Sequence, residues 1–595
     1  MIANKHTSKI IIAIVSAAVV LCILATAFSS TLTDALGGTG VAMEYETELF
    51  DVSEIININI IMDEDDWNEM LSSASSEEYW ACDVIVNGQR FYNVGIRPKG
   101  NTSLSSIAMD PDTDRFSLKL EFDHFVEGQT CFGLDKLILN NNYADATNMK
   151  EAVVYDMFQF LGADASLYNY ASVSLNGEYW GVYLALEGVE QSFMLRNYGT
   201  RDGELYKPDS MEMGGGSFDM SDADFSGFEG MTPPEMGDFD LSQMPDMGGF
   251  TPGQMPPDMP SDMPESPGGG FSTGGSGADL NYTDDDLDSY STIWEGEITG
   301  TGSADHRRVV TALQNISAGN EIEEYLDVDN ILKYMAVHAF VVNMDSLSGS
   351  MAHNYYLYEY DGQLNILPWD YNLSFGGMLG SGDATDMIND AIDTPFDGTD
   401  FFDCLLENEE YLEIYHSYLK QLVEEYVYGG RFDEVYSRIR SQIDTLVQTD
   451  PTAFYSYDEY LEASEMLYEV VKLRADSVEG QLHGTIASTD QGQREDSSDL
   501  IDGSYIDVSV MGEFDMGADF SEDMTEEFDV PDRGFPNGDF SGGPPDGSGM
   551  PDISGMTGGI SKIRTAITFC GCLAVMMIAL FTVKKVRRRT HKNIE

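Results

Sequence analysis

Oxygen-bearing side chains gather around one short turn in the second half of the chain. Asp361-Gly362 stands between two β-prone runs, a pattern typical of a two-residue hairpin turn. Counting outward from the turn places Asn354 opposite Trp369, and facing residues of a hairpin lie about 5 Å apart. Asp345 ends an apolar run that predicts a helix just upstream. We therefore expect Asp345, Asn354 and Asp370 to converge at the open end of this hairpin.

This set of side chains, with Asn372 close by, suits a hard divalent cation. Mg²⁺ keeps several waters and takes one or two carboxylates together with substrate phosphates. The order Asp, Asn, hairpin, Asp also follows the catalytic end of protein kinases, although neither HRD nor DFG occurs here. Spacing alone leaves two interpretations open, a metal-phosphate site and a turn stabilised by Asx hydrogen bonds.

Candidate phosphate-binding residues occur in the first half of the chain. Lys119 lies on the alternating segment RFSLKLEFD and could hold the α and β phosphates, with Glu151 on the following helix as its ion-pair partner. A short loop after a predicted strand could present backbone N–H groups to phosphate; it consists of Gly100, Asn101, Thr102 and Ser103. A solvated strand face for Lys119 and an ordinary turn for this loop are the alternatives.

The elements that must position these residues can be predicted from local patterns. Asn87-Gly88 and Asn176-Gly177 each separate two β-prone runs and predict hairpins. A helix is expected to end at Gly162, and the apolar helix before Asp345 is expected to be capped by Asp329 or Asn330. Charged amphipathic helices are expected over 405–428, 431–448 and 457–482. The fold class expected is therefore α+β, with a strand-rich lobe before a helical lobe.

Composition excludes several functions. The chain has 103 acidic and 31 basic residues and a net charge of −72, so nucleic acid is not expected as a partner. Basic proteins suit such a surface. Arg97 and Lys99 stand out beside the glycine loop, whereas His338 and His353 are expected to be structural. The sequence holds no Gly-x-Ser-x-Gly, His-Glu-x-x-His or Cys-His pair, so hydrolase interpretations rank low.

The ends and two acidic tracts complete the predicted organisation. Residues 1–30 predict a signal peptide or N-terminal membrane anchor, and 566–583 predict a transmembrane helix followed by a basic cytoplasmic tail, 584–595. This arrangement predicts a cell-membrane protein, single-pass or double-anchored, with most of the chain outside the cytoplasm. Between the ends we expect a strand-rich lobe (45–207), a disordered insertion rich in Met, Gly, Pro and Asp (208–288), a helical lobe (289–485) and a disordered acidic stalk (486–562).

Six motifs, in order, resemble the CotH family of spore-coat-protein-H-like atypical protein kinases. They are VGIRPKGNTSL, RFSLKLEFD, LNGEYWGVYLALEGVE, GELYKPD, NMDSLSGSMAHNYYLY and LPWDYNLSFGG. The resemblance covers about Ile55 to Gly377 and implies a divergent bilobal protein-kinase-like fold that uses ATP and Mg²⁺, with Mn²⁺ as an alternative metal. It matches Asp345 to the family's catalytic Asp and Asp370 to its metal-binding Asp. Asn372 stands where many members have a second Asp, which reduces the charge available to a metal.

The function that this resemblance implies is transfer of the ATP γ-phosphate to Ser or Thr of surface or exported proteins. The alternative is a surface-anchored adhesion or binding protein that keeps a kinase-like fold without turnover. Retention of Asp345, Asn354 and Asp370 favours the kinase.

Overall fold

The computed structural model describes residues 40–208, 277–349, 352–378, 384–396, 398–512 and 514. All of them belong to one compact unit, Met1–Ala518. Several predicted segments lie outside the described residues, namely the N-terminal leader or anchor (1–30), the apolar segment 566–583 and the basic tail 584–595. The same holds for most of the predicted insertion and for the predicted stalk beyond Phe514.

Seven strands of the first half form a closed barrel. Its order is β1-β2-β3-β4-β5-β7-β6, and a parallel pairing of β1 with β6 closes it. The strands are β1 (Ile56–Ile61), β2 (Trp80–Val86), β3 (Gln89–Lys99), β4 (Ser117–Glu121), β5 (Lys136–Asn140), β6 (Tyr168–Leu175) and β7 (Glu178–Glu187). Because the side chains of a strand alternate between its faces, alternate residues such as Leu118 and Leu120 are buried while Lys119 lies on the other face.

The predicted hairpins are confirmed. Asn87-Gly88 joins β2 to β3 and Asn176-Gly177 joins β6 to β7. In both pairs the Asn and the Gly have positive φ, the backbone conformation that a type I′ turn requires. Each turn also fixes the register of its hairpin, and so decides which residues of β3 and β7 face each neighbouring strand.

A second sheet, β10-β9-β8, carries the hairpin with the candidate chemistry. Its strands are β8 (Glu204–Tyr206), β9 (Tyr355–Tyr360) and β10 (Gln363–Pro368). Gln363 pairs with Tyr360 and Pro368 with Tyr355, which is the register expected for a turn at Asp361-Gly362. The next residues outward are therefore Asn354 on one strand and Trp369 on the other.

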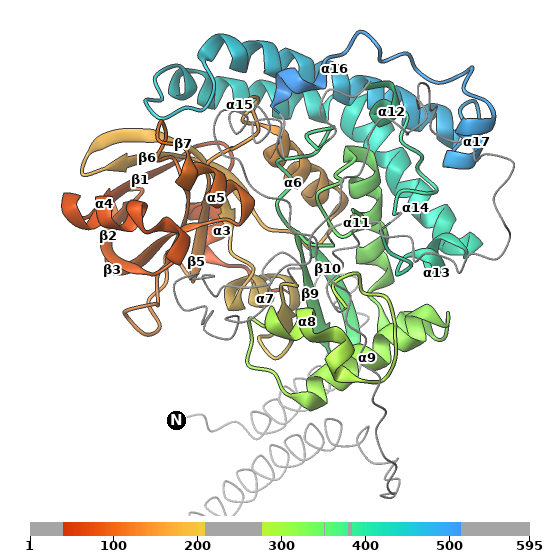
Figure 1. The fold of residues 1–595 in the computed structure, drawn as a ribbon, viewed down its shortest axis with the longest axis horizontal. Coiled ribbons are helices and arrows are strands. Elements are labelled where there is room, and N and C mark those ends of the chain that lie inside the picture. Colours follow the sequence, from red (N-terminus) through yellow and green to blue (C-terminus); the bar gives the residue numbers. More distant parts are fainter. Residues whose placement is uncertain are drawn as a thin grey trace, which may run out of the picture. The chain divides into compact units, whose positions relative to one another are not determined.

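Helices surround this sheet and one side of the barrel (Figure 1). The helices before the second sheet are α3 (Glu44–Glu48), α4 (Glu64–Ser72), α5 (Thr102–Met109), α6 (Lys150–Leu161), α7 (Gln191–Tyr198), α8 (Ser291–Glu295), α9 (Ser303–Ser317), α10 (Ile322–Tyr325) and α11 (Val328–Val341). Those after it are α12 (Ala384–Ile388), α13 (Asp403–Leu406), α14 (Glu409–Gln421), α15 (Arg431–Gln448), α16 (Tyr457–Leu482) and α17 (Asp490–Glu495). Helix α11 contacts α6, β10, α14 and α16, so it lies at the centre of the helical part.

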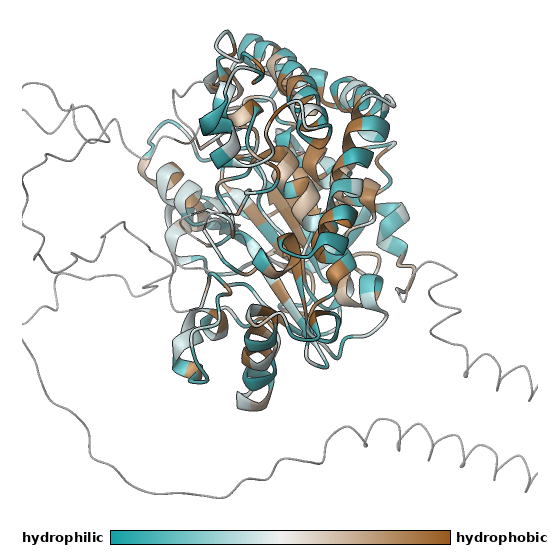
Figure 2. Ribbon diagram, turned by 90° about the vertical axis from the view of Figure 1, so that its right-hand side faces the viewer, coloured by the Kyte–Doolittle hydropathy of each residue, from teal (hydrophilic) through white to brown (hydrophobic). Residues whose placement is uncertain are grey.

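The α+β class is confirmed, with a barrel before a helical region. Figure 2 shows apolar residues concentrated where strands and helices face one another, with polar residues outside. Helices α15 and α16 have the bounds expected from the sequence, and α6 ends at Leu161 with Gly162 in the left-handed conformation as its cap. The likeness of the two parts to the lobes of a protein kinase stays a prediction.

Three expectations need correction. The cap of α11 is Asp327, whose side chain accepts a hydrogen bond from the Asn330 N–H, and neither Asp329 nor Asn330. Residues 486–512, assigned from composition to the acidic stalk, pack on the core instead: Val508 and Met511 are buried beside α16. No helix in the described ranges is long and apolar enough to cross a bilayer, so membrane anchoring and a cell-membrane location are not supported.

A closed ring of polar contacts ties the end of α6 to α11 and β10. The Asp164 N–H donates to Asn330 Oδ1 (2.7 Å), and Asn330 Nδ2 donates to Asn365 Oδ1 (2.7 Å). Asn365 Nδ2 completes the ring by donating to the Asp164 carboxylate (3.0 Å). Burial, together with the carboxylate of Asp327, raises the pKa of Asp164 to about 6. The ring therefore prefers a protonated Asp164, since ionisation places an incompletely compensated charge inside it.

We predict that Asp164→Asn removes a pH dependence of stability. The folded-state pKa of Asp164 is raised, so its stabilising effect is complete below about pH 3.8 and is lost as the pH rises through about 6. At pH 7 the free energy of unfolding of the variant should exceed that of the wild type by at most about 3 kcal/mol, so the variant should unfold at a higher temperature. The difference should vanish near pH 4. Thermal unfolding at several pH values measures this. Asp202→Asn, which removes an exposed carboxylate outside the ring, should not reproduce the pattern; a difference independent of pH would contradict the role of Asp164.

Candidate functional site

One cavity of about 640 Å³ receives side chains from the barrel, from α5 and α6, and from the β9–β10 hairpin. All ten candidate site residues line it: Gly100, Asn101, Thr102, Ser103, Lys119, Glu151, Asp345, Asn354, Asp370 and Asn372. The structure therefore brings together residues that are far apart in the sequence. The roles assigned to them stay predictions.

Asp345 is held from two sides. Asn354 Nδ2 donates to the Asp345 carboxylate (Oδ2, 3.0 Å) and also to the Asp345 main-chain carbonyl (2.9 Å). His353 Nε2 lies 2.8 Å from the other carboxylate oxygen, Oδ1. Both carboxylate oxygens keep further lone pairs, because each can accept two hydrogen bonds. Asp345 is thus fixed in orientation and still able to accept a proton.

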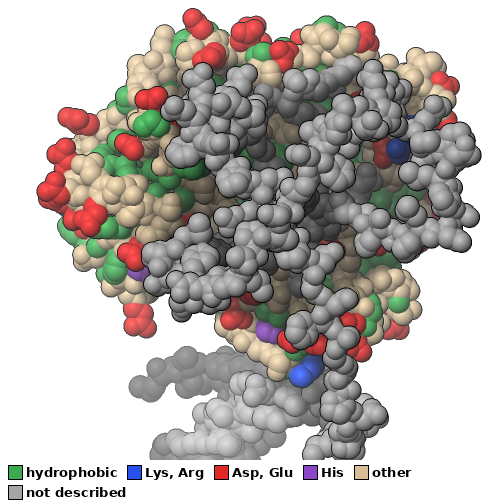
Figure 3. Space-filling model, in the orientation of Figure 1, with side chains coloured by type: hydrophobic (Ala, Val, Ile, Leu, Met, Phe, Trp, Pro, Cys, Tyr) green, Lys and Arg blue, Asp and Glu red, His purple; other side chains and the backbone are tan. Residues whose placement is uncertain are grey.

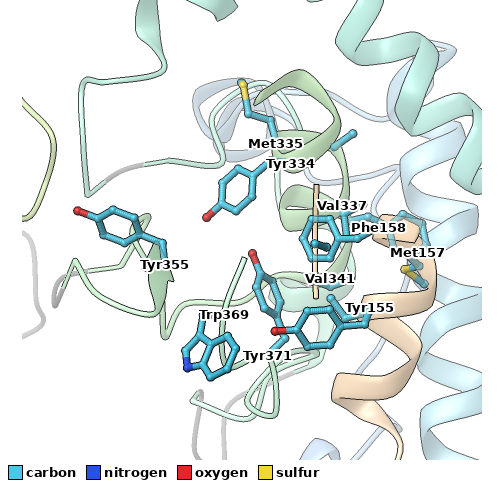
Figure 4. Close-up of a cluster of buried hydrophobic side chains, with 14 of the residues drawn as sticks. Tyr155, Met157, Phe158, Tyr334, Met335, Val337, Val341, Tyr355, Trp369 and Tyr371 are labelled. Carbon is cyan, nitrogen blue, oxygen red and sulfur yellow. The ribbon is translucent and has the colours of Figure 1, made fainter. Parts of the chain in front are cut away.

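Asp370 lies between two aromatic anchors. Figure 4 shows Trp369 and Tyr371 from the hairpin beside Tyr155 and Phe158 of α6 and residues of α11. Tyr371 is fully buried, its ring is 5.3 Å from that of Phe158, and its hydroxyl lies 3.1 Å from His338 Nδ1. His338 is therefore structural, as predicted.

The backbone at Asp370 is held in an uncommon conformation. Its φ is +59°, and that of Asn354 is also +59°. Non-glycine residues in this region cost of order 1–3 kcal/mol and persist where the surrounding packing over-determines them, often at functional sites. The burial of Trp369 and Tyr371 supplies that packing. No hydrogen bond or ion pair engages the Asp370 carboxylate within the described part of the chain.

The donor set fits Mg²⁺ in its chemistry. Asn372 Nδ2 donates to the Tyr143 carbonyl (3.0 Å) and Asn354 Nδ2 donates to Asp345, so the amide oxygens of both Asn residues are the atoms left to bind a cation. No group of three His, Cys, Asp or Glu side chains in the described ranges could hold a metal. A cation here would therefore rely on two carboxylates, amide oxygens, water and substrate phosphates, which is the usual Mg²⁺ pattern.

A row of cations also lines the cavity, and we call it the cation row. It consists of Arg97, Lys99, Lys119, Lys136 and Lys207. Strand pairing explains most of it, because Arg97 on β3 faces Lys119 on β4, and Lys119 faces Ile138, two residues beyond Lys136 on β5. Arg97 forms an ion pair with Glu77, and Lys136 forms ion pairs with Glu190 and Glu121.

Two members of the cation row, Lys119 and Lys99, sit where their charged forms are disfavoured. Burial and the neighbouring Arg97, Lys136, Lys207 and Lys99 hold the pKa of Lys119 well below its ordinary value. Burial also lowers the pKa of Lys99, against the opposing effect of Asp370 and Glu151. An anion with several negative charges would relieve this repulsion. The surface elsewhere has the opposite charge, since acidic side chains outnumber basic ones on the face drawn in Figure 3.

Glu151 has a different partner from the one expected. Asn140 Nδ2 donates to its carboxylate (2.8 Å), and burial together with the Asp370 carboxylate raises the pKa of Glu151 to about 8. The cation that acts on it is Lys99. Within the described residues no ion pair joins Glu151 to Lys119. Lys99 therefore replaces Lys119 as the candidate partner of Glu151 in a Lys–Glu pair. The Lys99 ammonium also lies 5.4 Å from the centre of the Trp369 ring.

The glycine loop leads into a helix. Gly100 has φ +136°, a backbone angle that residues other than glycine rarely adopt. Helix α5 begins two residues later, at Thr102. The first N–H groups of a helix lack partners within the helix and carry partial positive charge. Because this loop lines the same cavity as the cation row, its N–H groups add to the positive potential there.

Sequence reasoning missed four residues of the cavity. His353 was expected to be structural but contacts Asp345. Lys136 and Lys207 were not singled out, although each stands at the edge of a β-prone run in a chain with few cations. Phe514 lines the cavity but belongs to the tract 486–562, which was predicted from its composition to be disordered. Only the first three carried a signal, since a His next to the candidate Asn354 and isolated Lys residues can be seen in the sequence.

Comparison with known proteins gives two matches. A family model described as CotH kinase protein matches residues 96–478. Inner spore coat protein H of Bacillus subtilis (strain 168) is 22% identical over 254 residues, which cover 42% of this chain and 53% of that protein. The match thus spans about half the length of this relative.

We predict that the cation row binds inorganic tripolyphosphate. Lys119→Met should weaken binding about 10- to 100-fold, the usual effect of losing a charge-assisted hydrogen bond, and isothermal titration calorimetry at fixed salt measures it. Lys420→Met is the matched control, because Lys420 on α14 has a side chain that is 59% exposed and lies outside the cavity. Equal losses in the two variants would mean that net charge, and not this wall, governs binding.

Proposed function

Because this chain belongs to the CotH family, we propose that it is a protein kinase that transfers the γ-phosphate of ATP to Ser or Thr residues of proteins. The observation that carries this proposal is one cavity lined both by the carboxylate–amide set and by the cation row. Phosphoryl transfer needs positioning and charge stabilisation more than covalent chemistry, and these two sets of residues supply both.

Asp345 is the residue that we assign to the acceptor hydroxyl. Its carboxylate would accept the hydroxyl proton as the oxygen attacks phosphorus, which is the role of the catalytic Asp in protein kinases. Asn354 and His353 position it, since each contacts one carboxylate oxygen.

Asp370, with the amide oxygens of Asn354 and Asn372, would hold Mg²⁺ or Mn²⁺. The chemistry that such an ion would supply is neutralisation of the charge on the phosphate oxygens during transfer. Lys119 and Lys99 would bind the remaining phosphate oxygens, helped by the N–H groups that open α5. Glu151 lies close enough to Asp370 and Lys99 for both to affect its pKa, and it would keep Lys99 oriented.

The acceptor is a protein by this proposal, and the charge of this chain indicates which class of protein it would attract. The chain carries a net charge of −72, so basic, Ser/Thr-rich proteins would be attracted to it and acidic ones repelled. Free ATP would also be repelled by such a surface. The cation row would therefore attract nucleotide locally, in addition to binding its phosphate oxygens.

Two isosteric variants test the proposal directly. Purified chain incubated with γ-labelled ATP and Mg²⁺ should transfer label to a basic Ser-containing protein, and both Asp345→Asn and Asp370→Asn should lower the rate by at least about 100-fold. Asp458→Asn, on the exposed first turn of α16, is the control. Thermal shift with ATP and Mg²⁺ on the same samples separates loss of binding from loss of chemistry. No labelling, with no shift on adding nucleotide and metal, would leave a non-catalytic binding protein as the function.

Asn372→Asp should show two opposite effects. In metal-free protein the new carboxylate would face the Tyr143 carbonyl in place of the lost N–H···O bond, so we expect about 1–3 kcal/mol of destabilisation, seen as a Tm lower by a few degrees. The added charge should also make the rise in Tm on adding Mg²⁺ larger than in the wild type. An unchanged response to Mg²⁺ would remove Asn372 from the metal site.

A further inference from the structure

The cavity has two ends, which strand β5 and the residues after it define. At the start of β5, the Lys136 carbonyl accepts a hydrogen bond from the Gly188 N–H (3.0 Å) and the Lys136 side chain pairs with Glu190. Beyond its last residue, Asn140, the chain continues to Tyr143, which lines the cavity with Leu373, Met378 and Phe514. We call these four residues the apolar end; the other is the Lys136 end.

Lys99 and Asn372, two of the residues assigned to phosphoryl transfer, lie toward the apolar end. Lys99 faces Ser117, whose hydroxyl oxygen accepts from the Asn141 N–H (3.1 Å), so Lys99 is level with the finish of β5. Asn372 donates to the Tyr143 carbonyl, and so joins the candidate metal site to the same end. The remaining cations, Lys119 and then Lys136, lead away from it. On the proposed function, a triphosphate would have its transferred group beside Asp370 and its nucleoside toward the Lys136 end.

Geometry then fixes the side from which the acceptor arrives. Attacking and leaving oxygens are roughly in line across the transferred phosphorus. In that pose the leaving oxygen would point along the cation row, so the acceptor oxygen would come from the apolar end.

A strap from the C-terminal part of the described chain builds that end. We define the strap as residues 503–512 and 514. The Phe514 N–H donates to the Gly377 carbonyl (3.0 Å), and the Phe514 ring packs edge-on against Tyr143 with ring centres 6.1 Å apart. The Ala146 N–H donates to the Met511 carbonyl (3.0 Å), and the Lys150 ammonium to the Gly512 carbonyl (3.0 Å).

The strap fits closely enough to be specific. Gly512 has φ +84°, and a Cβ there would meet the Ala144 carbonyl oxygen at 2.7 Å. The strap also lies outside residues 96–478, the range that the family model matches. Its contribution to the cavity therefore belongs to this chain's own C-terminal part and not to the matched family range.

We propose that Phe514 is a specificity-determining residue, and that the acceptor is a Ser or Thr hydroxyl flanked by a large apolar side chain that packs on Phe514, Tyr143 and Met378. This rests on the proposed kinase function. None of the four residues of the apolar end carries a charge, so an acidic or basic flanking residue finds no partner there. Phe514 is half-buried, which leaves part of its ring open to the cavity.

The transfer itself balances with the groups already named. The acceptor oxygen forms a bond to the γ-phosphorus of ATP, and the bond from that phosphorus to the β–γ bridging oxygen breaks. The hydroxyl proton passes to the Asp345 carboxylate, and ADP is released. Phe514 takes no part in these bonds and acts only by holding the flanking side chain.

Two matched peptides test the inference on the full chain. Arg-Arg-Leu-Ser-Leu and Arg-Arg-Gly-Ser-Gly have the same charge, and with γ-labelled ATP and Mg²⁺ we expect the first to have a kcat/KM about tenfold or more higher, as burial of a Leu side chain implies. Phe514→Ala should remove this preference through a higher KM for the Leu peptide, and Phe514→Leu should restore most of it. Phe454→Ala is the control, because Phe454 packs on Tyr143 (5.3 Å between ring centres) but does not line the cavity; it should keep the preference.

A second readout separates this inference from the kinase proposal. Binding of the unreactive peptide Arg-Arg-Leu-Ala-Leu, followed by fluorescence anisotropy, should be weakened by Phe514→Ala and not by Phe454→Ala. Labelling of both peptides at equal rates, or a preference that survives Phe514→Ala, would overturn the inference and leave the kinase intact. Peptide binding that depends on Phe514 without labelling of any substrate would support the apolar end and overturn the kinase.

Discussion

Burial of Tyr371 is the interaction on which the arrangement of this protein depends. The ring lies against Phe158 of α6, and its hydroxyl reaches His338 of α11, so one side chain joins the helix between barrel strands β5 and β6 to the central helix and to the second sheet. Asp370 is its neighbour in the chain, and the anchored ring holds the left-handed backbone there. The strained backbone at Asp370 keeps one conformation because an apolar cluster beside it is already packed.

The cation row contains the opposite kind of feature, since burial disfavours the charged forms of Lys119 and Lys99 within it. Arg97, Lys119 and Lys136 are brought together by strand register, and burial together with like charges lowers the pKa of Lys119. Partners such as Glu190 offset part of the repulsion. The protein therefore tolerates repulsion between cations and a strained backbone in the same cavity, which is where an anion and a cation would bind together.

The sequence allowed prediction of those features that local chemistry determines. Asn-Gly turns, the cap at Gly162, the bounds of α15 and α16 and the hairpin register at Asp361-Gly362 follow from patterns a few residues long, and the structure has them. Closure of the barrel and the partner of Glu151 depend on contacts between distant segments, which no local pattern encodes. The strap was missed for a similar reason, because its few buried residues, such as Met511, are diluted by acidic ones in a composition count.

The position of the strap also has a consequence for synthesis. Chains emerge from the ribosome with the N-terminal end first, and their compact parts fold as they emerge. Asp345 and Asp370 therefore leave the ribosome long before Phe514, and Tyr143 waits longer still for the ring that packs on it. On the proposed function, a nascent chain could bind nucleotide before its acceptor side is complete, and translation of the strap would decide when the newly made protein can begin to discriminate between acceptors.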